Sequence, residues 1–204
     1  MRRETAGITE ALIESAKREF LEYGFQNANL RRISAAGGVS TNSIYTRFGD
    51  KSGLFSAVVK PAADGLMRIY LESISGAEKC ENASAAANLG GEGTELVLKY
   101  IYDNFDVFRL IFCYSSGTEY EHYFDELASI EERYYREFAA QFAGEGNCPS
   151  DFFIHVVCRT GWQYIYEVVS HKLTYDEAKS FMKSIREYSF AGWAKVLGTE
   201  ISDY

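Results

Sequence analysis

Apolar residues recur at helical spacing along most of the chain. Ile8, Leu12, Ala16 and Phe20 are four residues apart and so share one face of a helix, which we expect over residues 5–23. The same spacing returns repeatedly toward the C-terminus, and the sequence holds only 2 prolines in 204 residues. Because proline breaks helix interiors, this pattern predicts an all-α fold of about nine helices.

Between residues 29 and 48 the pattern changes to two short helices around a glycine pair. Asn29 is the expected N-cap of the first helix and Ser40 that of the second. Gly37 and Gly38 can adopt the positive φ that a sharp turn between helices needs. The first helix of the chain, expected to end at Gly24, would complete a three-helix bundle with this pair. The apolar residues expected to hold the short helices together are Leu30, Ile33, Val39, Ile44 and Phe48.

This layout is that of a helix-turn-helix, whose second helix can lie in the major groove of DNA. Residues 1–60 carry 9 Lys or Arg against 6 Asp or Glu, a balance of +3, whereas the rest of the chain has a balance of −11. Local charge rather than the total of −8 sets attraction to phosphates, so the basic part fits a DNA-reading element. The outward side chains that can hydrogen-bond to a nucleic acid are Arg31, Arg32, Thr41, Asn42, Ser43, Tyr45, Thr46 and Arg47.

After the second glycine turn, a long helix is expected from Lys51 onward, with a kink at Pro61. Residues 75–93 are rich in Gly, Ala, Asn and Ser, so we expect a loop with a short helix over residues 83–88 and a flexible glycine linker at 90–93. Further helices are expected over residues 94–104, 107–114, 118–142, 152–171 and 175–197.

Polar residues mark where several of these helices should begin. Asp106 is the expected N-cap of the helix over 107–114, and Thr-x-x-Glu capping boxes at Thr118 and Thr174 should open two others. Residues 144–150 form a break. The helix over 152–171 is apolar on nearly every face, and such a helix must be covered on two sides.

Several classes of protein are disfavoured by what the sequence lacks. It has no run of about 18 apolar residues and no signal-peptide core, so we expect a cytoplasmic protein without a membrane span. Cys80, Cys113, Cys148 and Cys158 show no metal-binding spacing and should be reduced thiols. No H-E-x-x-H, G-x-S-x-G or phosphate-loop motif occurs, so we expect no enzyme, no metal and no cofactor.

Residues at fixed spacing over positions 8–55 form one extended motif. They are Ile8, Ala16, Phe20, Gly24, Phe25, Asn29, Ile33, Gly38, Val39, Ser40, Ile44, Tyr45, Phe48, Lys51, Leu54 and Phe55. This motif, in the first quarter of the chain, resembles that of the TetR family of bacterial one-component repressors. The sequence departs from the family pattern with Asn29 where threonine is usual, Ser34 and Gly37 where alanine is usual, and Arg47 where histidine or tyrosine is common. Ser34 and Gly37, in place of alanine, should loosen the first short helix and the turn slightly.

The resemblance implies a DNA-binding domain over residues 1–50 and an effector-binding and dimerisation domain over 51–204. It implies a homodimer through the helices at about 152–171 and 175–197, which binds a double-stranded, pseudo-palindromic operator. Thr41, Asn42, Ser43 and Thr46 would then meet base edges or nearby phosphates, while Arg31, Arg32, Tyr45 and Lys51 would contact the backbone. Ser40 and Arg47 complete this expected DNA-contacting set.

The resemblance also implies a small-molecule effector, which would release the repressor from its operator. The chain holds 15 Tyr and 14 Phe, which favours an aromatic or hydrophobic compound. The candidate effector-binding residues are Phe105, Phe108, Phe112, His122, Tyr123, His155, Arg159, Trp162 and Tyr166. Each aromatic candidate could instead be a plain core residue, and each polar candidate could instead lie exposed. An alternative for the whole protein is a helical small-molecule or protein-binding module with a vestigial helix-turn-helix.

Overall fold

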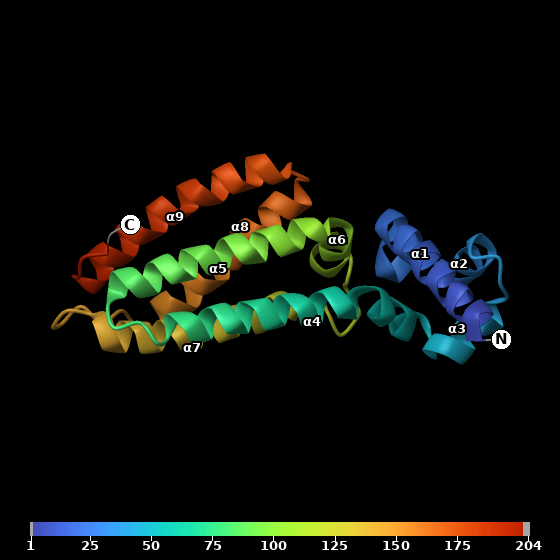
Figure 1. Ribbon diagram of the computed structural model, residues 1–204, viewed down its shortest axis with the longest axis horizontal. Coiled ribbons are helices and arrows are strands. Elements are labelled where there is room, and N and C mark those ends of the chain that lie inside the picture. The colour runs from blue at the N-terminus through green and yellow to red at the C-terminus, as the bar shows by residue number, and fades with distance from the viewer. Residues whose placement is uncertain (1, 202–204) are drawn as a thin grey trace. The chain divides into compact units, whose positions relative to one another are not determined.

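The computed structural model describes residues 2–201, with side chains from residue 7 onward, and within them the chain is all-α (Figure 1). Nine helices and no strand occur in this part of the chain, as the apolar spacing predicted. The helices are α1 (Arg2–Asn27), α2 (Leu30–Ala36), α3 (Thr41–Phe48), α4 (Lys51–Ala77), α5 (Ala83–Asp103), α6 (Phe105–Cys113), α7 (Tyr123–Phe142), α8 (Asp151–Ser170) and α9 (Tyr175–Leu197). None of the helices in residues 2–201 is both long and apolar enough to cross a membrane.

The chain divides into two compact units. The first contains the residues up to Asp64 together with Asn104–Tyr123, and the second contains Gly65–Asp103 and the residues from Phe124 onward. α4 therefore contributes its first half to one unit and its second half to the other. Pro61 lies inside α4, close to this division.

Aromatic side chains form the centre of the first unit. The ring of Phe55 lies 5.0 Å from that of Phe20 and 5.4 Å from that of Phe25, in edge-to-face arrangements that aromatic rings favour. Gly24 adopts φ 71° and ψ 167°, so helical geometry is broken there as predicted, although the helical run resumes and ends at Asn27. This break turns Phe25 into the core, where its amide donates to the Tyr114 carbonyl at 3.1 Å.

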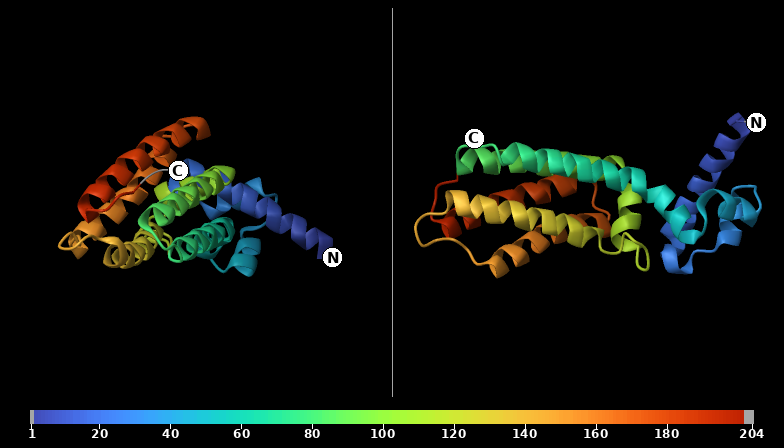
Figure 2. Two further views of the ribbon diagram at one scale, coloured as in Figure 1. Left: turned by 60° about the vertical axis from the view of Figure 1, so that its left-hand side comes forward. Right: turned by 90° about the horizontal axis from the view of Figure 1, so that it is seen from below.

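Long helices build the second unit. Figure 2 shows α7 alongside the second half of α4, and Figure 1 shows α5 running alongside that helix in the opposite direction. One part of its core gathers Phe138, Ile154, Cys158, Trp193 and Leu197. The capping box predicted at Thr174 is present and opens α9, and α9 ends at Gly198 in the left-handed conformation.

The loop predicted over residues 75–93 is wrong. α4 continues to Ala77, and α5 begins at Ala83 and carries the four residues at 90–93 in its interior. The glycines there serve close helix packing instead of flexibility. A Cβ at Gly93 would lie 2.7 Å from Cβ of Ser73 on α4, and one at Gly91 would lie 2.6 Å from Cζ of Arg186 on α9.

Two predicted helix starts are also wrong. α6 begins at Phe105, so Asp106 lies in its first turn and Asn104 holds the N-cap position. α7 begins at Tyr123 rather than Thr118, because Glu121 accepts from the Gly117 amide at 3.1 Å instead of closing a capping box. The Thr118 hydroxyl donates to the Ser115 carbonyl at 2.7 Å, which stabilises a turn in place of a helix.

The helix over 152–171 is observed as α8, but its surroundings only partly follow the prediction. Ile154, Cys158 and Trp162 are buried, as a covered helix requires. Phe152 is 75% exposed and Val156 is 44% exposed, so one face of the helix stays uncovered in the single chain.

Candidate functional site

The two short helices α2 and α3 are held together by one apolar and one polar contact. Ile33 and Ile44 are fully buried, as expected of core residues. Leu30, Val39 and Phe48 are only half-buried, although Val39 and Phe48 were expected to be core residues. The hydroxyls of Ser34 and Thr41 lie 3.0 Å apart and join the helices directly. The expectation that Ser34 loosens this element is therefore wrong, since its side chain links the two helices.

The caps of the two helices differ. Asn29 accepts from the amide of Arg31 at 2.8 Å, which confirms it as the N-cap of α2. Ser40 occupies the N-cap position of α3, but its side chain accepts no capping hydrogen bond and instead lies 3.2 Å from the Ser43 hydroxyl. Of the glycine pair, only Gly38 has a positive φ, at 68°.

Glu19 of α1 holds the start of α2 in position through hydrogen bonds. Its carboxylate accepts from the Asn29 amide and from Nε of Arg32, both at 2.8 Å. The Arg32 guanidinium also lies over the Tyr23 ring, 4.2 Å from its centroid. The sequence prediction did not include Glu19, although its spacing of seven residues from Leu12 places it on the buried face of α1.

One face of α3 presents polar side chains to solvent. Asn42, Tyr45 and Thr46 are exposed, with Tyr45 at 53%. Thr41 and Ser43 are half-buried, and Arg47 is half-buried with its Nε donating to the Thr9 hydroxyl at 3.3 Å. The face of α3 centred on Tyr45 is therefore the part of the helix-turn-helix that a nucleic acid could reach.

Two basic residues, one before and one after α3 in the sequence, are held differently. Arg31 is exposed and makes no side-chain hydrogen bond or ion pair to the described residues. Lys51 donates to the carbonyls of Gln26 and Ala28, at 3.0 and 3.4 Å, and lies over the Phe25 ring. A cation at these carbonyls satisfies the end of α1, so Lys51 also has a structural role.

The candidate effector-binding residues do not all fall in one unit. The first unit contains Phe105, Phe108, Phe112, His122 and Tyr123, and the second contains His155, Arg159, Trp162 and Tyr166. Phe108 is fully buried, and the hydroxyl of Tyr123 donates to the Ala63 carbonyl at 2.7 Å. Both residues therefore have core contacts of their own.

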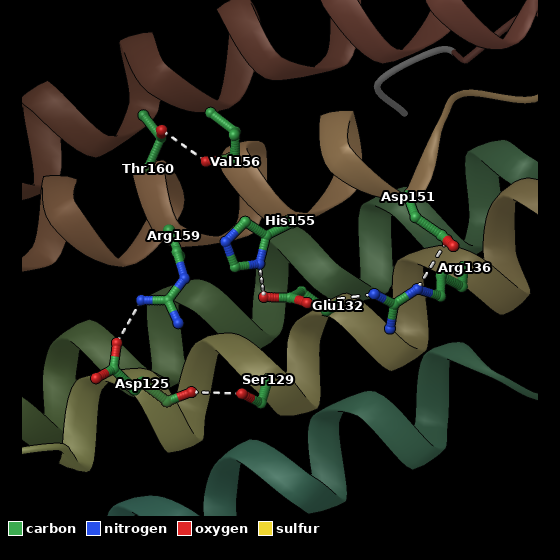
Figure 3. A network of polar contacts seen from close by, with 9 residues as sticks. All are labelled: Asp125, Ser129, Glu132, Arg136, Asp151, His155, Val156, Arg159 and Thr160. Carbon is green, nitrogen blue, oxygen red and sulfur yellow. Dashed lines mark hydrogen bonds and ion pairs between the residues drawn. The ribbon is translucent and has the colours of Figure 1, made fainter.

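His155 and Arg159 belong to a polar network that joins α7 to α8 (Figure 3). The imidazole of His155 lies 2.8 Å from Glu132, which also pairs with Arg136 at 3.3 Å, and Arg159 pairs with Asp125. About 40% of each side chain is exposed, 41% for His155 and 44% for Arg159. Trp162, by contrast, is buried, and Tyr166 packs edge-on against Phe124.

Two polar groups near Trp162 were absent from the sequence prediction. Glu131 lies four residues after the buried Leu127, on the inward face of α7, and Tyr70 comes from α4. The inward position of Glu131 could have been found from this spacing alone. No group of three or more His, Cys, Asp or Glu side chains in the described residues could hold a metal ion.

Residues 12–58, which span α2, α3 and their flanks, match the family model described as bacterial regulatory proteins, tetR family. This helix-turn-helix segment is of the TetR family type. The transcriptional repressor AcnR of Corynebacterium glutamicum is 34% identical to it over 64 residues, which are 31% of this chain and 34% of AcnR. The chain thus spans about a third of the length of that relative.

Solved structures extend the likeness to the whole fold. NalD of Pseudomonas aeruginosa, described as a secondary repressor of a multidrug efflux pump, aligns with 88% of this chain and 95% of its own at a TM-score of 0.63. SmeT of Stenotrophomonas maltophilia, also an efflux-pump repressor, aligns with 96% of this chain and 91% of its own at 0.60. Each is 14% identical to this chain, so the likeness concerns the fold alone.

Proposed function

We propose that this chain is a TetR-family transcriptional repressor that binds a pseudo-palindromic operator as a homodimer and leaves it when a small molecule binds. The observation that carries the proposal is the solvent-facing side of α3, where Asn42, Tyr45 and Thr46 stand clear of the core. A helix with such a face can enter a major groove. The relatives that match about a third of this chain are named as transcriptional repressors.

The DNA contacts would divide by how each side chain is held. Asn42 and Thr46, which are exposed, would meet base edges, and Tyr45 and Arg31 would contact phosphates. Arg32 and Lys51 would contribute mainly by fixing α2 and the start of α4, because both are already bound within the first unit. The local charge of +3 favours this end of the chain for phosphate contact.

The homodimer would form through α8 and α9, and residues 51–204 would bind the effector. Large apolar side chains on these two helices are solvent-exposed in the single chain, which is typical of an interaction surface. They are Phe152, Phe153, Val156, Phe181 and Tyr188. A two-fold dimer would place two copies of α3 in successive major grooves.

The test is a titration of the full-length protein with labelled duplexes selected from its own genome, followed by fluorescence anisotropy at several salt concentrations. We expect specific duplexes to bind about a thousand-fold or more tightly than random ones, with affinity falling steeply as salt rises. Binding that never exceeds that of random DNA would contradict the proposal. It would favour a small-molecule or protein-binding module whose helix-turn-helix is vestigial.

Tyr45→Ala tests the placement of α3. Because Tyr45 is 53% exposed and lies outside the core, its loss should weaken operator binding about ten-fold while the folded dimer persists. Anisotropy gives the affinity, and sedimentation gives the oligomeric state. An unchanged affinity would show that this face of α3 does not meet DNA.

A further inference from the structure

A carboxyl group lies inside the second unit without a positively charged partner among the described residues. Oε2 of Glu131, on α7, is buried and accepts no hydrogen bond from the described residues. The hydroxyl of Tyr70, on α4, is likewise buried and has no partner among them. Such unpartnered groups are rare because each costs free energy to desolvate, so two together in one place call for an explanation.

Aromatic rings surround these two groups. The Tyr70 ring meets that of Trp162 edge-on at 5.1 Å, and Phe124 meets Trp162 at 6.0 Å. On α8, Gly161 faces the carboxylate, whose oxygens would lie 3.7 and 3.8 Å from a Cβ placed there. The helix that faces Glu131 therefore brings no side chain over it at this position. Glu131 and Tyr70 are half-buried as whole residues, so the cluster lies just beneath the surface.

The charged and titratable neighbours do not neutralise Glu131. Burial raises the pKa values of Tyr70 on α4, Tyr134 and Tyr135 on α7, and Cys158 on α8, so these four groups stay uncharged. Burial also raises the pKa of Glu131 to about 8, against the opposing effect of its hydrogen bond from Trp162.

The basic side chains of the neighbouring network are already paired with other acids. Figure 3 shows Arg136 with Glu132 and Asp151, His155 with Glu132, and Arg159 with Asp125. Among the described residues, the neighbourhood of Glu131 thus combines the phenols of Tyr70, Tyr134 and Tyr135 with several aromatic rings, and its carboxyl has no cation of its own.

We propose that Glu131, Tyr70 and Trp162 form the recognition site for an apolar organic cation. This proposal rests on the repressor function proposed above and names the chemical class of its effector. Binding of the cation displaces the proton of Glu131, and the cation then provides the positively charged partner that this carboxylate lacks. The aromatic rings of Tyr70 and Trp162 stabilise the same positive charge through their faces, and the apolar body of the ligand covers the cluster. An anion or a neutral compound of equal size gains only the apolar contact and neither of the electrostatic ones.

The decisive probes are tetraphenylphosphonium and tetraphenylborate, which have nearly the same size and shape but opposite charge. Calorimetric titration of the full-length protein in the absence of DNA measures both. We expect the cation to bind and the anion to bind at least about ten-fold more weakly, the factor expected for one charge-assisted hydrogen bond or ion pair. Equal binding of the two ions, or binding of neither, would overturn the proposal.

The pH dependence gives a second readout. The cation carries no titratable group, so its affinity should rise as Glu131 loses its proton, by up to about ten-fold per pH unit between pH 6 and 8. Glu131→Gln should remove this dependence and weaken cation binding about ten- to a hundred-fold at pH 8. Glu137→Gln, on the exposed side of the same helix, is the matched control and should change neither.

Gly161→Ala is a second variant that tests the same site even if Glu131→Gln fails to fold. Its methyl group would meet the carboxylate oxygens at ordinary contact distance, and alanine favours the helix, so the variant should be at least as stable and bind the cation more weakly. Unchanged cation affinity in both variants would overturn the proposal.

Operator affinity is measured separately, so a protein that binds its operator but not the cation refutes this proposal alone. One that binds the cation but no operator refutes only the repressor function.

Discussion

Arg31 and Arg32 are neighbours in α2, yet the folded chain gives them different tasks. Arg31 is exposed and makes no side-chain hydrogen bond or ion pair with the described residues, whereas Arg32 binds Glu19 and covers the Tyr23 ring. The hydrogen bond from Arg32 holds the same carboxylate that accepts from Asn29, at the start of the helix. At the scale of single residues, the same side chain is exposed to solvent in one position and bound to the bundle in the next.

This difference predicts opposite effects of two alanine substitutions. Arg31→Ala should leave the thermal unfolding midpoint unchanged and lower the slope of log affinity against log salt by about one, as expected for one lost phosphate contact. Arg32→Ala should lower the free energy of unfolding by about 1–2 kcal/mol, since a part-buried carboxylate loses its charged donor. Calorimetry and salt-dependent anisotropy separate the two effects. Equal loss of stability in both variants would contradict this assignment.

At the scale of elements, the glycine turn between α2 and α3 depends on one glycine rather than two. Gly37 has φ −81°, and a Cβ there would make contacts of 3.4 Å or more with Leu12 and Ser15. Gly38 has φ 68°, a conformation that a side chain disfavours.

Gly37→Ala should therefore stabilise the protein by about 0.4–1 kcal/mol through the unfolded state, and Gly38→Ala should destabilise it by about 1–2 kcal/mol. Urea unfolding measures both against the parent protein. A destabilised Gly37→Ala variant would show that the turn tolerates no added methyl group at either position.

The glycines of α5 act at the same scale, by allowing helices to approach. Gly93→Ala should destabilise the second unit by about 1–3 kcal/mol, because the added Cβ would meet Cβ of Ser73 at 2.7 Å and force α4 and α5 apart. Gly90→Ala is the control on the same helix, since nothing lies within 4 Å of its Cβ position. It should stabilise by about 0.8–1 kcal/mol through helix propensity. Thermal unfolding followed by circular dichroism measures both, and similar midpoints for the two variants would argue against close packing at Gly93.

At the scale of the whole molecule, the exposed apolar side chains of α8 and α9 set the expected assembly. Phe152 is 75% exposed and Tyr188 is 71% exposed, so Phe152→Ser and Tyr188→Ser should leave the folded chain intact but raise the dimer dissociation constant about ten-fold or more each. Leu96→Ser, at a 57% exposed position on α5, is the control and should leave the dimer unchanged. Sedimentation velocity over a range of concentrations gives the dissociation constants. Loss of dimer in the Leu96 variant alone would place the interface elsewhere.

The sequence by itself determined the local features of this protein. Helical spacing, the Asn29 cap, the Thr174 capping box and the motif over residues 8–55 depend on residues close together in the chain, so the bounds of α2 and the TetR family could be predicted. The helix-turn-helix followed for the same reason.

Only the tertiary structure decided which side chains are free to act. Glycines that look like a linker lie inside α5 because Ser73 and Arg186 come from other helices. Arg32 is engaged because Glu19 lies beneath it, and Glu131 is buried beside Tyr70 and Trp162, which are distant in sequence. Contacts between distant residues leave no periodic trace in the chain, so the roles of these residues emerge only when the helices pack.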